Sequence, residues 1–418
     1  MNEVEKKLSN ADLIKKEYVC SFFQPIVCLG TGKIFAYEAL IRGKHPETDT
    51  IISPADLFAA ADAQNKSVEF DKICQQSALE YFQEFSRSTD ALLFMNINTS
   101  LLSSDNDHFG NLNALTQKMG FAPSVIGIEL IESRAKDSEY LVSFVNRHRE
   151  TGFLIVVDDF GCEHSNMERL IQIHPDIIKI DRSIICGIES DLYRQSILKS
   201  IHGLSQMTGS LCLAEGVETV EEILTCYRLG VDLFQGFGIA KPAFDLAQVE
   251  KETISRVKEL RKIIKEDTLK KLKEKRRLTG DINSLANWLL KQISMEKLER
   301  LHPVFEEFIV MNPEIECIYL LDSTGKQISN TIISPFLEKR EGSYIFVPGI
   351  IGTDQSFKSY FTCFEAFPID RYLSDPYLSS ASGNLCRTLA VKKYNEKKDE
   401  YIILCMDFIE ETIKSPIP

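Results

Sequence analysis

The sequence lacks a basic excess and long apolar runs, and each absence excludes a class of protein. Its 418 residues hold 48 Lys and Arg against 61 Asp and Glu, a formal net charge of −13. Duplex phosphates need a basic face, so we expect no nucleic-acid polymer as partner. No apolar run approaches the roughly 20 residues of a bilayer-spanning helix. The polar start MNEVEKKLSN is also unlike a signal peptide, and we expect no membrane insertion.

Paired cysteine motifs are also absent. The eleven cysteines are scattered without any CxxC pair, and an odd number fits neither a disulfide framework nor a zinc ribbon. Hydrophobic residues make up 44% and charged residues 26%, which indicates ordinary globular packing. We therefore expect a soluble, cytoplasmic protein.

Over the first 245 or so residues, short apolar runs alternate with longer amphipathic stretches. This order predicts parallel strands covered by helices, with one or two of those helices between residues 53 and 85. Eight runs over this length favour a (β/α)₈ barrel over an open doubly wound sheet. The runs are FFQPIV (22–27), KIFAYEAL (33–40), ALLFMNIN (91–98), SVIGIELIE (124–132), FLIVVDDF (153–160), DIIKID (176–181), SLCLAEGVE (210–218) and DLFQGFGI (232–239).

Most of these runs carry a polar or charged residue near their end. A single strand-end acid is more often a helix N-cap or a solvated loop start. In a closed parallel barrel, however, all strand C-termini open onto one face, where barrel active sites lie. We therefore expect one pocket to contain Glu38, Asn96, Glu129, Asp158, Asp159, Lys179, Glu215 and Gln235.

Five carboxylates in one cleft cannot all stay ionised unless cations neutralise them. Oxygen donors without Cys or a His cluster point to Mg²⁺ or Mn²⁺ rather than zinc. The adjacent pair Asp158 and Asp159 could bridge two ions, the usual device for phosphodiester hydrolysis, with Lys179 orienting the attacking water. Acids and a Lys at barrel strand ends also suit metal-assisted enolisation, so the chemistry alone leaves both reactions open.

Two further segments follow the barrel (1–245). Residues 246–279 are charged and net basic with an apolar residue every three or four positions, which predicts an amphipathic connecting helix ended by Gly280. Residues 281–418 form a second unit, predicted as helices followed by an antiparallel α+β sheet. Its strand candidates are ECIYLLDSTGKQIS (316–329), which holds a turn between two strands, and YIFVP, CRTLAV and EYIILCMDF.

The motif YEALIR (37–42) resembles the signature of the EAL domain family of bacterial cyclic di-GMP phosphodiesterases. The motifs FFQPIV, FMNIN, IELIES, VDDFG, IIKIDRS, AEGVET and FQGFGIAKP follow in the family's order over roughly residues 15–245. The resemblance implies a modified TIM barrel that uses divalent cations to cleave one phosphodiester bond of cyclic di-GMP, giving linear pGpG in second-messenger signalling.

The resemblance also implies roles for individual residues. The first-metal ligands are Glu38, Asn96, Glu129 and Asp158, although Asn98 lies on the same strand face as Asn96 and stays an alternative. The second-metal ligands are Asp158, Asp159 and Glu215; the catalytic residues are Lys179, Glu215 and Gln235, with Lys179 and Gln235 holding the water. Glu132 would steady a neighbouring loop. The positions near the dinucleotide are Gln24, Leu40, Arg42, Asp181, Gln235 and Pro242.

The sequence departs from the family pattern in the loop after the Asp-Asp strand. It reads DDFGCEHSNM (158–167) where the family reads DDFGTGYSSL or close to it, and Ile131 replaces the usual Thr. Glu163 cannot cheaply adopt the backbone angles open to a Gly. In the family this loop shapes the second-metal site and the dimer interface, so we expect a homodimer. The alternative function is a catalytically weak or inactive cyclic di-GMP receptor or scaffold.

The second unit resembles the PAS or Cache-like sensor domains found after some EAL barrels. The resemblance rests on IYLLDSTGKQIS and YLSDPYLSSASGNLCRTLAV. It implies either a sensor that binds an unidentified small molecule and regulates the barrel, or a dimerisation module that binds nothing. Candidate pocket residues are Tyr360, Phe361, Arg371, Tyr377 and Arg387, although Tyr and Phe at such places are more often core.

Overall fold

The chain forms two compact units, Met1–Lys265 and Glu266–Pro418, and each is considered by itself. The computed structural model describes residues 14–45, 50–86, 89–102, 108–130, 138–162, 167–295, 300–337, 345–395 and 400–409. Within these ranges, no helix combines the length and the apolar character needed to cross a bilayer.

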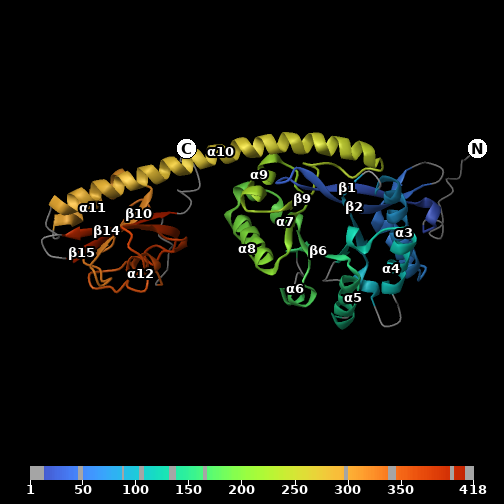
Figure 1. Cartoon of the computed structure of the whole chain (residues 1–418), viewed down its shortest axis with the longest axis horizontal. Helices are drawn as coiled ribbons and strands as arrows, with labels where there is room; N and C mark the ends of the chain where they lie inside the picture. Colours follow the sequence, from blue (N-terminus) through green and yellow to red (C-terminus); the bar gives the residue numbers. More distant parts are fainter. Residues whose placement is uncertain are drawn as a thin grey trace, which may run out of the picture. The chain divides into compact units, whose positions relative to one another are not determined.

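Eight strands of the first unit close into a barrel, which confirms the predicted architecture (Figure 1). Going round the barrel, the order is β1-β9-β8-β7-β6-β5-β4-β2, and β2 pairs again with β1. The short strand β3 (Ile51–Ile52) pairs with β2 outside the ring. The barrel strands are β1 (Val19–Cys28), β2 (Lys33–Lys44), β4 (Leu92–Ile97), β5 (Ile126–Leu130), β6 (Leu154–Phe160), β7 (Ile177–Ile180), β8 (Leu211–Ala214) and β9 (Leu233–Phe234).

Strand β1 runs opposite to the other seven, so the expectation of eight parallel strands is wrong at this position. It pairs antiparallel with both β2 and β9, whereas the pairs from β2 round to β9 are parallel. Only residues 29–32 separate β1 from β2. A connection this short can join only antiparallel neighbours, because a parallel pair needs a crossover of about a dozen residues or more.

Helices cover the outside of the barrel and begin where the sequence supplies capping groups. Two of them lie between residues 53 and 85, as predicted: α2 begins after Ser53, whose side chain caps it, and α3 follows. Thr219 and Glu222 form a capping box at the start of α9. The helices are α2 (Pro54–Asp62), α3 (Ser67–Ser86), α4 (His108–Lys118), α5 (Ser138–Thr151), α6 (Met167–Ile173), α7 (Arg182–Ile185), α8 (Leu192–Thr208) and α9 (Val220–Arg228), with short 3₁₀ turns at Lys16–Tyr18, Thr99–Leu101, Pro123–Val125 and Ile188–Ser190.

The inside of the barrel holds one layer of apolar side chains drawn from the strands. At Gly127 of β5, an added Cβ would lie 2.5 Å from the ring of Phe94, so this ring fills the space that a side chain on β5 would take. The layer closes the barrel beneath the strand C-termini. Its buried members are Ile26, Ala36, Phe94, Val156, Ile177, Leu213 and Leu233.

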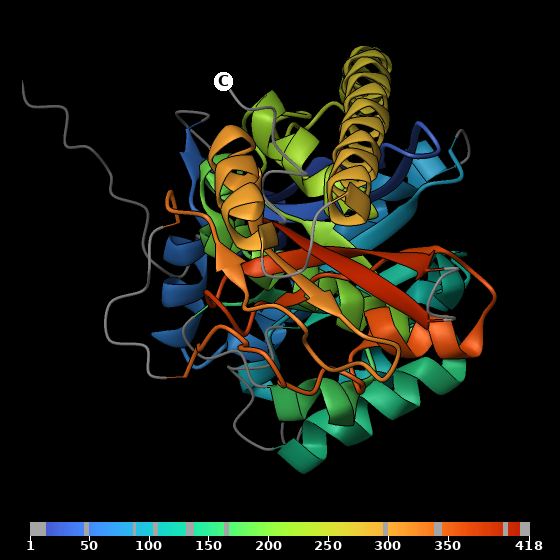
Figure 2. The ribbon, with the colours of Figure 1, turned by 90° about the vertical axis from the view of Figure 1, so that its left-hand side faces the viewer.

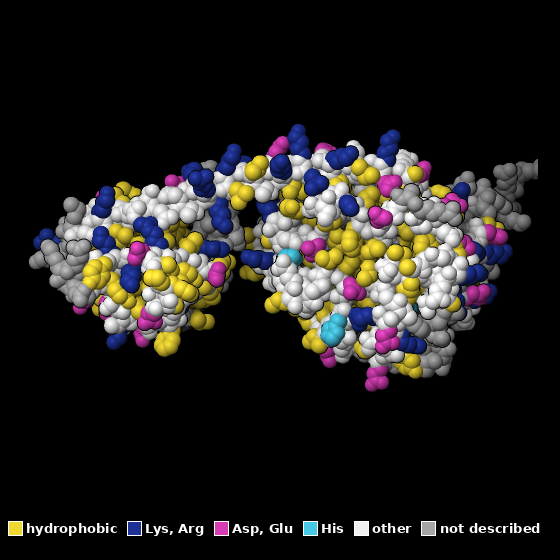
Figure 3. Space-filling model, viewed as in Figure 1, with side chains coloured by type: hydrophobic (Ala, Val, Ile, Leu, Met, Phe, Trp, Pro, Cys, Tyr) yellow, Lys and Arg dark blue, Asp and Glu magenta, His cyan; other side chains and the backbone are white. Residues whose placement is uncertain are grey.

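Helix α10 (Leu246–Met295) is one uninterrupted helix of 50 residues, so its predicted end at Gly280 is wrong. A glycine in a helix costs only about 1 kcal/mol, which the apolar stripe beyond it offsets. Val249, Val257 and Leu260 pack in the first unit, whereas Leu289 and Ile293 pack in the second. The boundary between the units, after Lys265, therefore falls inside the segment expected to be a separate linker. Lys and Arg side chains gather along this helix on the face shown in Figure 3.

The second unit contains the predicted antiparallel sheet, of six strands in the order β11-β10-β15-β14-β12, with β13 also paired to β14. The segment YIFVP is not a strand in the described residues 345–348, and Ile345 and Val347 are exposed there. Without a neighbouring strand its backbone groups have no ladder to join. The elements are α11 (Leu301–Met311), β10 (Ile315–Leu321), β11 (Ile332–Ile333), α12 (Ser359–Ala366), β12 (Arg371–Leu373), β13 (Tyr377–Leu378), β14 (Leu385–Asn395) and β15 (Glu400–Ile409).

The two faces of this sheet differ in polarity. One face packs against α11 and the end of α10 through apolar side chains, and α12 covers the other face (Figures 1 and 2). On the α12 face, Asp407 of β15 is buried and accepts hydrogen bonds from Thr388 Oγ1 (2.7 Å), Cys317 Sγ (3.2 Å) and Tyr377 OH (3.2 Å). Burial raises the pKa of Asp407 from 3.8 to about 6, although these hydrogen bonds oppose the rise.

Asp407→Asn is expected to change how the stability of the second unit depends on pH. A carboxyl with a raised pKa in the folded state stabilises the fold while protonated, and this contribution disappears as pH rises from about 4 through about 6. The rise from 3.8 to about 6 corresponds to about 3 kcal/mol. Because Asn cannot ionise, the free energy of unfolding of Asp407→Asn relative to wild type should improve by up to that amount between pH 4 and pH 7.

Trp288, the single tryptophan, makes this measurable in the second unit alone. Its ring stacks on Phe308, with centroids 5.1 Å apart and planes 11° from parallel, so its fluorescence follows unfolding of that core. Denaturant titrations at pH 4.5 and 7.5 give the comparison. A difference between variant and wild type that stays constant with pH contradicts the prediction.

Candidate functional site

A layer of polar side chains lies directly above the apolar layer of the barrel. Strand side chains alternate between two faces, so a residue two positions after an interior residue also points inward, one step nearer the strand's end. In seven strands the polar residue comes two positions after the residue that lies at the level of the apolar layer. In the antiparallel β1 the polar residue comes two positions before it. The polar layer consists of Gln24, Glu38, Asn96, Glu129, Asp158, Lys179, Glu215 and Gln235.

Lys179 of β7 is the centre of this layer and is 1% exposed. Its Nζ lies 2.6 Å from Glu215 Oε1, 2.8 Å from Glu129 Oε1, 3.0 Å from Asp158 Oδ1 and 3.6 Å from Glu38 Oε2. Four carboxylates from four strands therefore share one ammonium group. If all four were ionised, three negative charges would remain without a counterion.

Two side-chain amides connect the carboxylates further. Asn96 Nδ2 donates to Glu38 Oε1 (3.0 Å) and to Glu129 Oε2 (2.9 Å). Gln235 Nε2 donates to Glu38 Oε2 (2.6 Å) and to Gln24 Oε1 (3.3 Å). These contacts bring Asn96 into the cluster.

Asn98, the alternative to Asn96, makes a different contact. Its Oδ1 accepts from the backbone N–H of Ser100 (3.2 Å) and caps the 3₁₀ turn that begins at Thr99. The structure thus gives the two asparagines separate positions, Asn96 among the acids and Asn98 at the turn.

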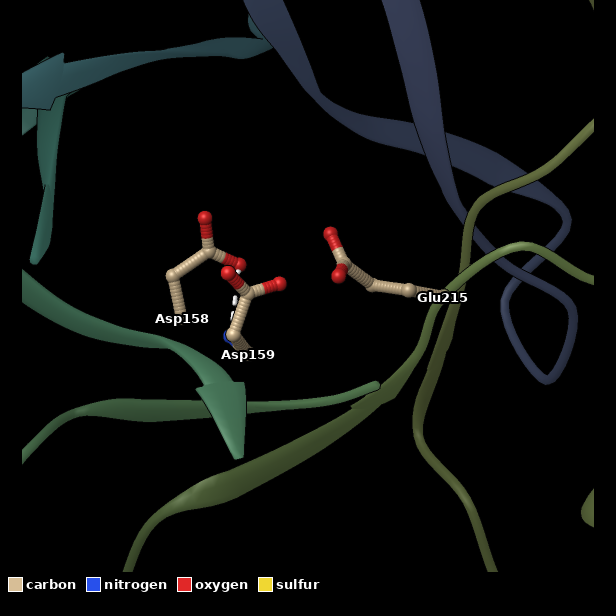
Figure 4. Close-up of side chains that lie close together, drawn as sticks. All are labelled: Asp158, Asp159 and Glu215. Atoms are coloured by element: carbon tan, nitrogen blue, oxygen red, sulfur yellow. Dashed lines mark hydrogen bonds between the residues drawn. The ribbon is translucent and has the colours of Figure 1, made fainter. Parts of the chain in front are cut away.

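Asp158 and Asp159 both reach Glu215 because β6 is irregular at its end. The pairing of β6 with β7 shifts between Val157 and Phe160, and Asp159 has a φ of 54°. Such a bulge re-aims side chains that would otherwise alternate between faces, and Asp tolerates the left-handed region better than most residues. Asp158, Asp159 and Glu215 can each place one oxygen within 4.8 Å of the others. Figure 4 shows the three carboxylates grouped together at the strand ends.

The cluster's electrostatics favour taking up positive charge. Burial would lower the pKa of Lys179, but Asp158, Glu129, Glu215 and Glu38 raise it well above its ordinary value. Burial raises the pKa of Glu129 well above its usual range and that of Glu215 to about 8, with Lys179 opposing both rises. Without further cations these two carboxyls are therefore held toward the protonated form.

Divalent cations fit this site by the chemistry of its donors. Every candidate ligand is a carboxylate or amide oxygen, the donor type preferred by Mg²⁺, Mn²⁺ and Ca²⁺. Gln235 is 3% exposed, and its Oε1 is buried without a hydrogen-bond partner among the residues that the structure describes. A buried amide oxygen without a donor is unfavourable, so the site has an acceptor available for a bound water or hydroxyl group.

An open pocket of about 200 Å³ lies over one side of the cluster. Five residues that the sequence predicts for the site line this pocket: Gln24, Glu38, Asp181, Glu215 and Gln235. Sequence reasoning missed Arg182 and Glu218, whose side chains form a 2.6 Å ion pair at the rim, and Phe237, which is 55% exposed. The available signal was adjacency, because these three residues stand in the motifs IIKIDRS, AEGVET and FQGFGIAKP. The pocket residues are Gln24, Glu38, Asp181, Arg182, Glu215, Gly216, Glu218, Gln235, Gly236 and Phe237.

Three predicted dinucleotide contacts do not line this pocket. Leu40 and Arg42 share the strand face of Glu38 further along β2, where the Arg42 guanidinium lies 5.9 Å from the Phe22 ring centroid. Pro242 is half-buried in the segment that pairs with β1. Glu132 and most of the altered loop, residues 163–166, lie outside the described residues.

The five candidate pocket residues of the second unit are not brought together. Tyr360, Phe361 and Tyr377 belong to the α12 face of the sheet. Arg371 Nη1 instead donates to Asn283 Oδ1 of α10 (2.7 Å), and Arg387 alternates with Thr388 on β14 and points to the opposite face.

Comparison with known proteins identifies a family and several relatives. The profile of the EAL domain family matches residues 5–242. The "Cyclic di-GMP phosphodiesterase PA2567" of Pseudomonas aeruginosa is 28% identical over 223 residues, 53% of this chain and 38% of that protein. The "Uncharacterized EAL-domain containing protein YkuI" of Bacillus subtilis is 23% identical over 399 residues, 93% of this chain and 94% of that one. Four curated relatives are much longer proteins, of which the match covers 27% to 44%.

Solved structures resemble this chain as well. The crystal structure of Bacillus subtilis YkuI, in complex with c-di-GMP and calcium, matches 96% of this chain and 99% of that one with a TM-score of 0.76 at 22% identity. It shows a shared fold across both units. The Klebsiella pneumoniae BlrP1 structure, a manganese and cyclic di-GMP complex, covers 54% of this chain and 56% of that one with a TM-score of 0.50 at 27% identity.

Proposed function

This chain belongs to the EAL domain family, and on that premise we propose that it hydrolyses one phosphodiester bond of cyclic di-GMP to give linear pGpG. The observation that carries the proposal is the polar layer itself, in which four carboxylates on four strands surround Lys179. Relatives named cyclic di-GMP phosphodiesterases, and structures of relatives with this dinucleotide and calcium or manganese, support the same reading.

We propose that two divalent cations, Mg²⁺ or Mn²⁺, bind in this layer. Glu38, Asn96, Glu129 and Asp158 would hold the first, and Asp158, Asp159 and Glu215 the second. Bound cations lower the pKa of water and neutralise charge that develops on the phosphate. Glu129 and Glu215, whose protonated forms burial favours, would lose their protons on holding the cations.

The chain's own residues then position the water and the dinucleotide. Lys179 Nζ donates and Gln235 Oε1 accepts at the attacking water, and Glu215 lies beside them. The water oxygen bonds to phosphorus while the bond from phosphorus to O3′ breaks, and O3′ gains a proton as the attacking water loses one. Gln24 and Asp181 contact the dinucleotide in the pocket, and Arg42, Leu40 and Pro242 extend this contact along β2 and the segment after β9. Glu132 steadies a loop near the site.

The test is to incubate the purified protein with cyclic di-GMP and Mn²⁺ or Mg²⁺ and to separate the products by chromatography. Linear pGpG is expected with the metal and not with EDTA. Cyclic di-AMP serves as the control for the base, and equal cleavage of both dinucleotides argues against the proposed substrate. Absence of pGpG with either metal refutes the hydrolysis.

The second candidate function is a cyclic di-GMP receptor or scaffold that binds without turnover. The replacement of the family's Thr-Gly-Tyr by Cys162, Glu163 and His164 favours it. Restoring the loop to DDFGTGYSSM should raise turnover at least tenfold if the native loop limits the reaction, and leave it unchanged if the native protein is already an active enzyme. Calorimetric binding of cyclic di-GMP to both forms is the control for folding.

Three further proposals concern the protein's setting. All eleven cysteines are free, which supports a cytoplasmic location. We propose a homodimer, which light scattering after gel filtration would refute by finding a monomer at micromolar concentration. We also propose that the second unit is a PAS-like domain that regulates the barrel, either as a sensor of a small molecule or through dimerisation.

A further inference from the structure

The loop after β9, residues 235–240, carries Gln235 and Phe237 into the pocket and is fixed through its backbone. Its neighbour is the segment 216–218, which follows Glu215. Gly238 N donates to Val217 O (2.8 Å), and Val217 N donates to Gln235 O (3.1 Å). Gly236 has a φ of 153°, and an added Cβ there would lie 2.2 Å from Val217 O. Pocket residues on both segments therefore depend on where this loop sits.

Helix α10 reaches the same loop through Arg256. Arg256 Nε donates to the carbonyl oxygen of Gly238 (2.9 Å), and its Nη1 forms an ion pair with Glu259 Oε2 (2.8 Å) one turn along the helix. The Arg256 side chain is 28% exposed, so the contact is partly shielded from water. The neighbouring helix residues Val257 and Leu260 are buried in the barrel core, which holds this part of α10 in place.

The other end of the loop is tied to the catalytic cluster. Gln24 Nε2 donates to Ala240 O (3.1 Å), and Gln24 Oε1 accepts from Gln235 Nε2 (3.3 Å). Gln235 Nε2 also donates to Glu38 Oε2 (2.6 Å). A chain of hydrogen bonds and loop backbone thus leads from α10 through residues 238–240 to Glu38.

We propose that Arg256 is a positioning residue of the site: by holding the Gly238 carbonyl, it keeps the 235–240 loop where Gln235 contacts Glu38 and Gln24. The expected effect on kcat rests on the proposed function, whereas the expected effect on the position of the loop does not. Helix α10 continues into the core of the second unit through Leu289 and Ile293, so Arg256 links the site to a helix that both units share.

The chain offers a matched control in Arg261. It lies on the same helix and Arg261 Nη2 also donates to a backbone carbonyl, that of Gly30 (3.2 Å), but in the turn between β1 and β2. That turn precedes β2 and so lies at the end of the barrel opposite the polar layer. Arg261→Ala removes a comparable contact between helix and barrel without touching the loop.

The experiment compares Arg256→Ala, Arg256→Lys and Arg261→Ala in the full chain. Hydrogen–deuterium exchange over residues 233–243 should be faster in Arg256→Ala than in wild type and unchanged in Arg261→Ala. The kcat for cyclic di-GMP should fall roughly tenfold in Arg256→Ala, with less change in KM, and Arg256→Lys should recover most of the loss. Similar midpoints of thermal unfolding for the two alanine variants would exclude a general loss of stability.

Two outcomes overturn the proposal. One is unchanged exchange over 233–243 in Arg256→Ala, and the other is an equal effect of Arg261→Ala on exchange and on kcat. The exchange measurement needs no substrate, so it tests the position of the loop even if the wild type is inactive. An inactive wild type would refute the proposed function but not the contact between Arg256 and the loop. Faster exchange with an unchanged kcat in an active wild type also refutes a positioning role.

Discussion

Lys179→Met is expected to abolish hydrolysis and to destabilise the metal-free first unit by about 3–5 kcal/mol, the usual cost of removing one partner from a buried ion cluster. The variant leaves Glu38, Glu129, Asp158 and Glu215 facing one another without an ammonium group. Turnover should fall by about 100-fold or more, because a preorganised cationic donor is lost. Circular dichroism of the metal-free protein at pH 7.5 measures the stability.

Divalent cations should restore part of this stability, because they replace the missing positive charge. Millimolar Mn²⁺ is therefore expected to raise the unfolding midpoint of Lys179→Met more than that of wild type. Lys16→Met is the matched control, since Lys16 pairs with Glu80 at the surface with 47% of its side chain exposed. Such a pair contributes at most about 1 kcal/mol. Equal destabilisation by the two variants would contradict a charge-dependent cluster around Lys179.

Unlike Lys179→Met, Glu38→Gln is expected to lose turnover without losing stability. Turnover should fall by more than about 100-fold, while the metal-free protein should be no less stable than wild type. Gln occupies the same volume, and its single amide oxygen can still accept from one of the two donors, Asn96 Nδ2 or Gln235 Nε2. It also removes one of the four carboxyl groups around Lys179, which lessens the crowding of acidic groups within the cluster. Rates of pGpG formation and thermal unfolding without metal give the two quantities.

Glu80→Gln, at the surface pair with Lys16, is the control for a Glu-to-Gln change and should alter neither quantity. A Glu38→Gln variant that keeps wild-type turnover would exclude Glu38 as a cation ligand. A variant that is strongly destabilised without metal would show that the Glu38 charge supports the fold, contrary to the expectation.

The barrel and its polar layer were predictable because strand geometry links them. Val156 and Ile177, two residues of the apolar layer, stand two positions before Asp158 and Lys179, respectively. This spacing is visible in the sequence. Convergence of these residues follows from closure of the barrel alone. The roles of single residues as ligands do not follow, because the predicted strand 91–98 places Asn96 and Asn98 on one face, whereas in the structure the strand ends at Ile97 and Asn98 caps the next turn.

The features that sequence reasoning missed depend on contacts between distant segments. The reversed direction of β1 is the exception, because it follows from the short turn at residues 29–32, a local feature of the sequence. Helix α10 passes Gly280 because residues beyond it, including Leu289, find a core in the second unit. The irregular pairing of β6 near Asp159 depends on the neighbouring strand. The exposure of Ile345 and Val347 likewise depends on which segments pair as strands, which a single sequence does not record.

The most direct test of the central claim, that the strand-end carboxylates form a divalent-cation site, is to count bound Mn²⁺ by calorimetry without cyclic di-GMP, which the protein would cleave during the titration. We predict two Mn²⁺ per chain in the wild type, fewer in Glu38→Gln, and two again in Asp407→Asn, whose substituted carboxyl is buried in the other unit. Wild-type protein that binds no more Mn²⁺ than Glu38→Gln would contradict the claim.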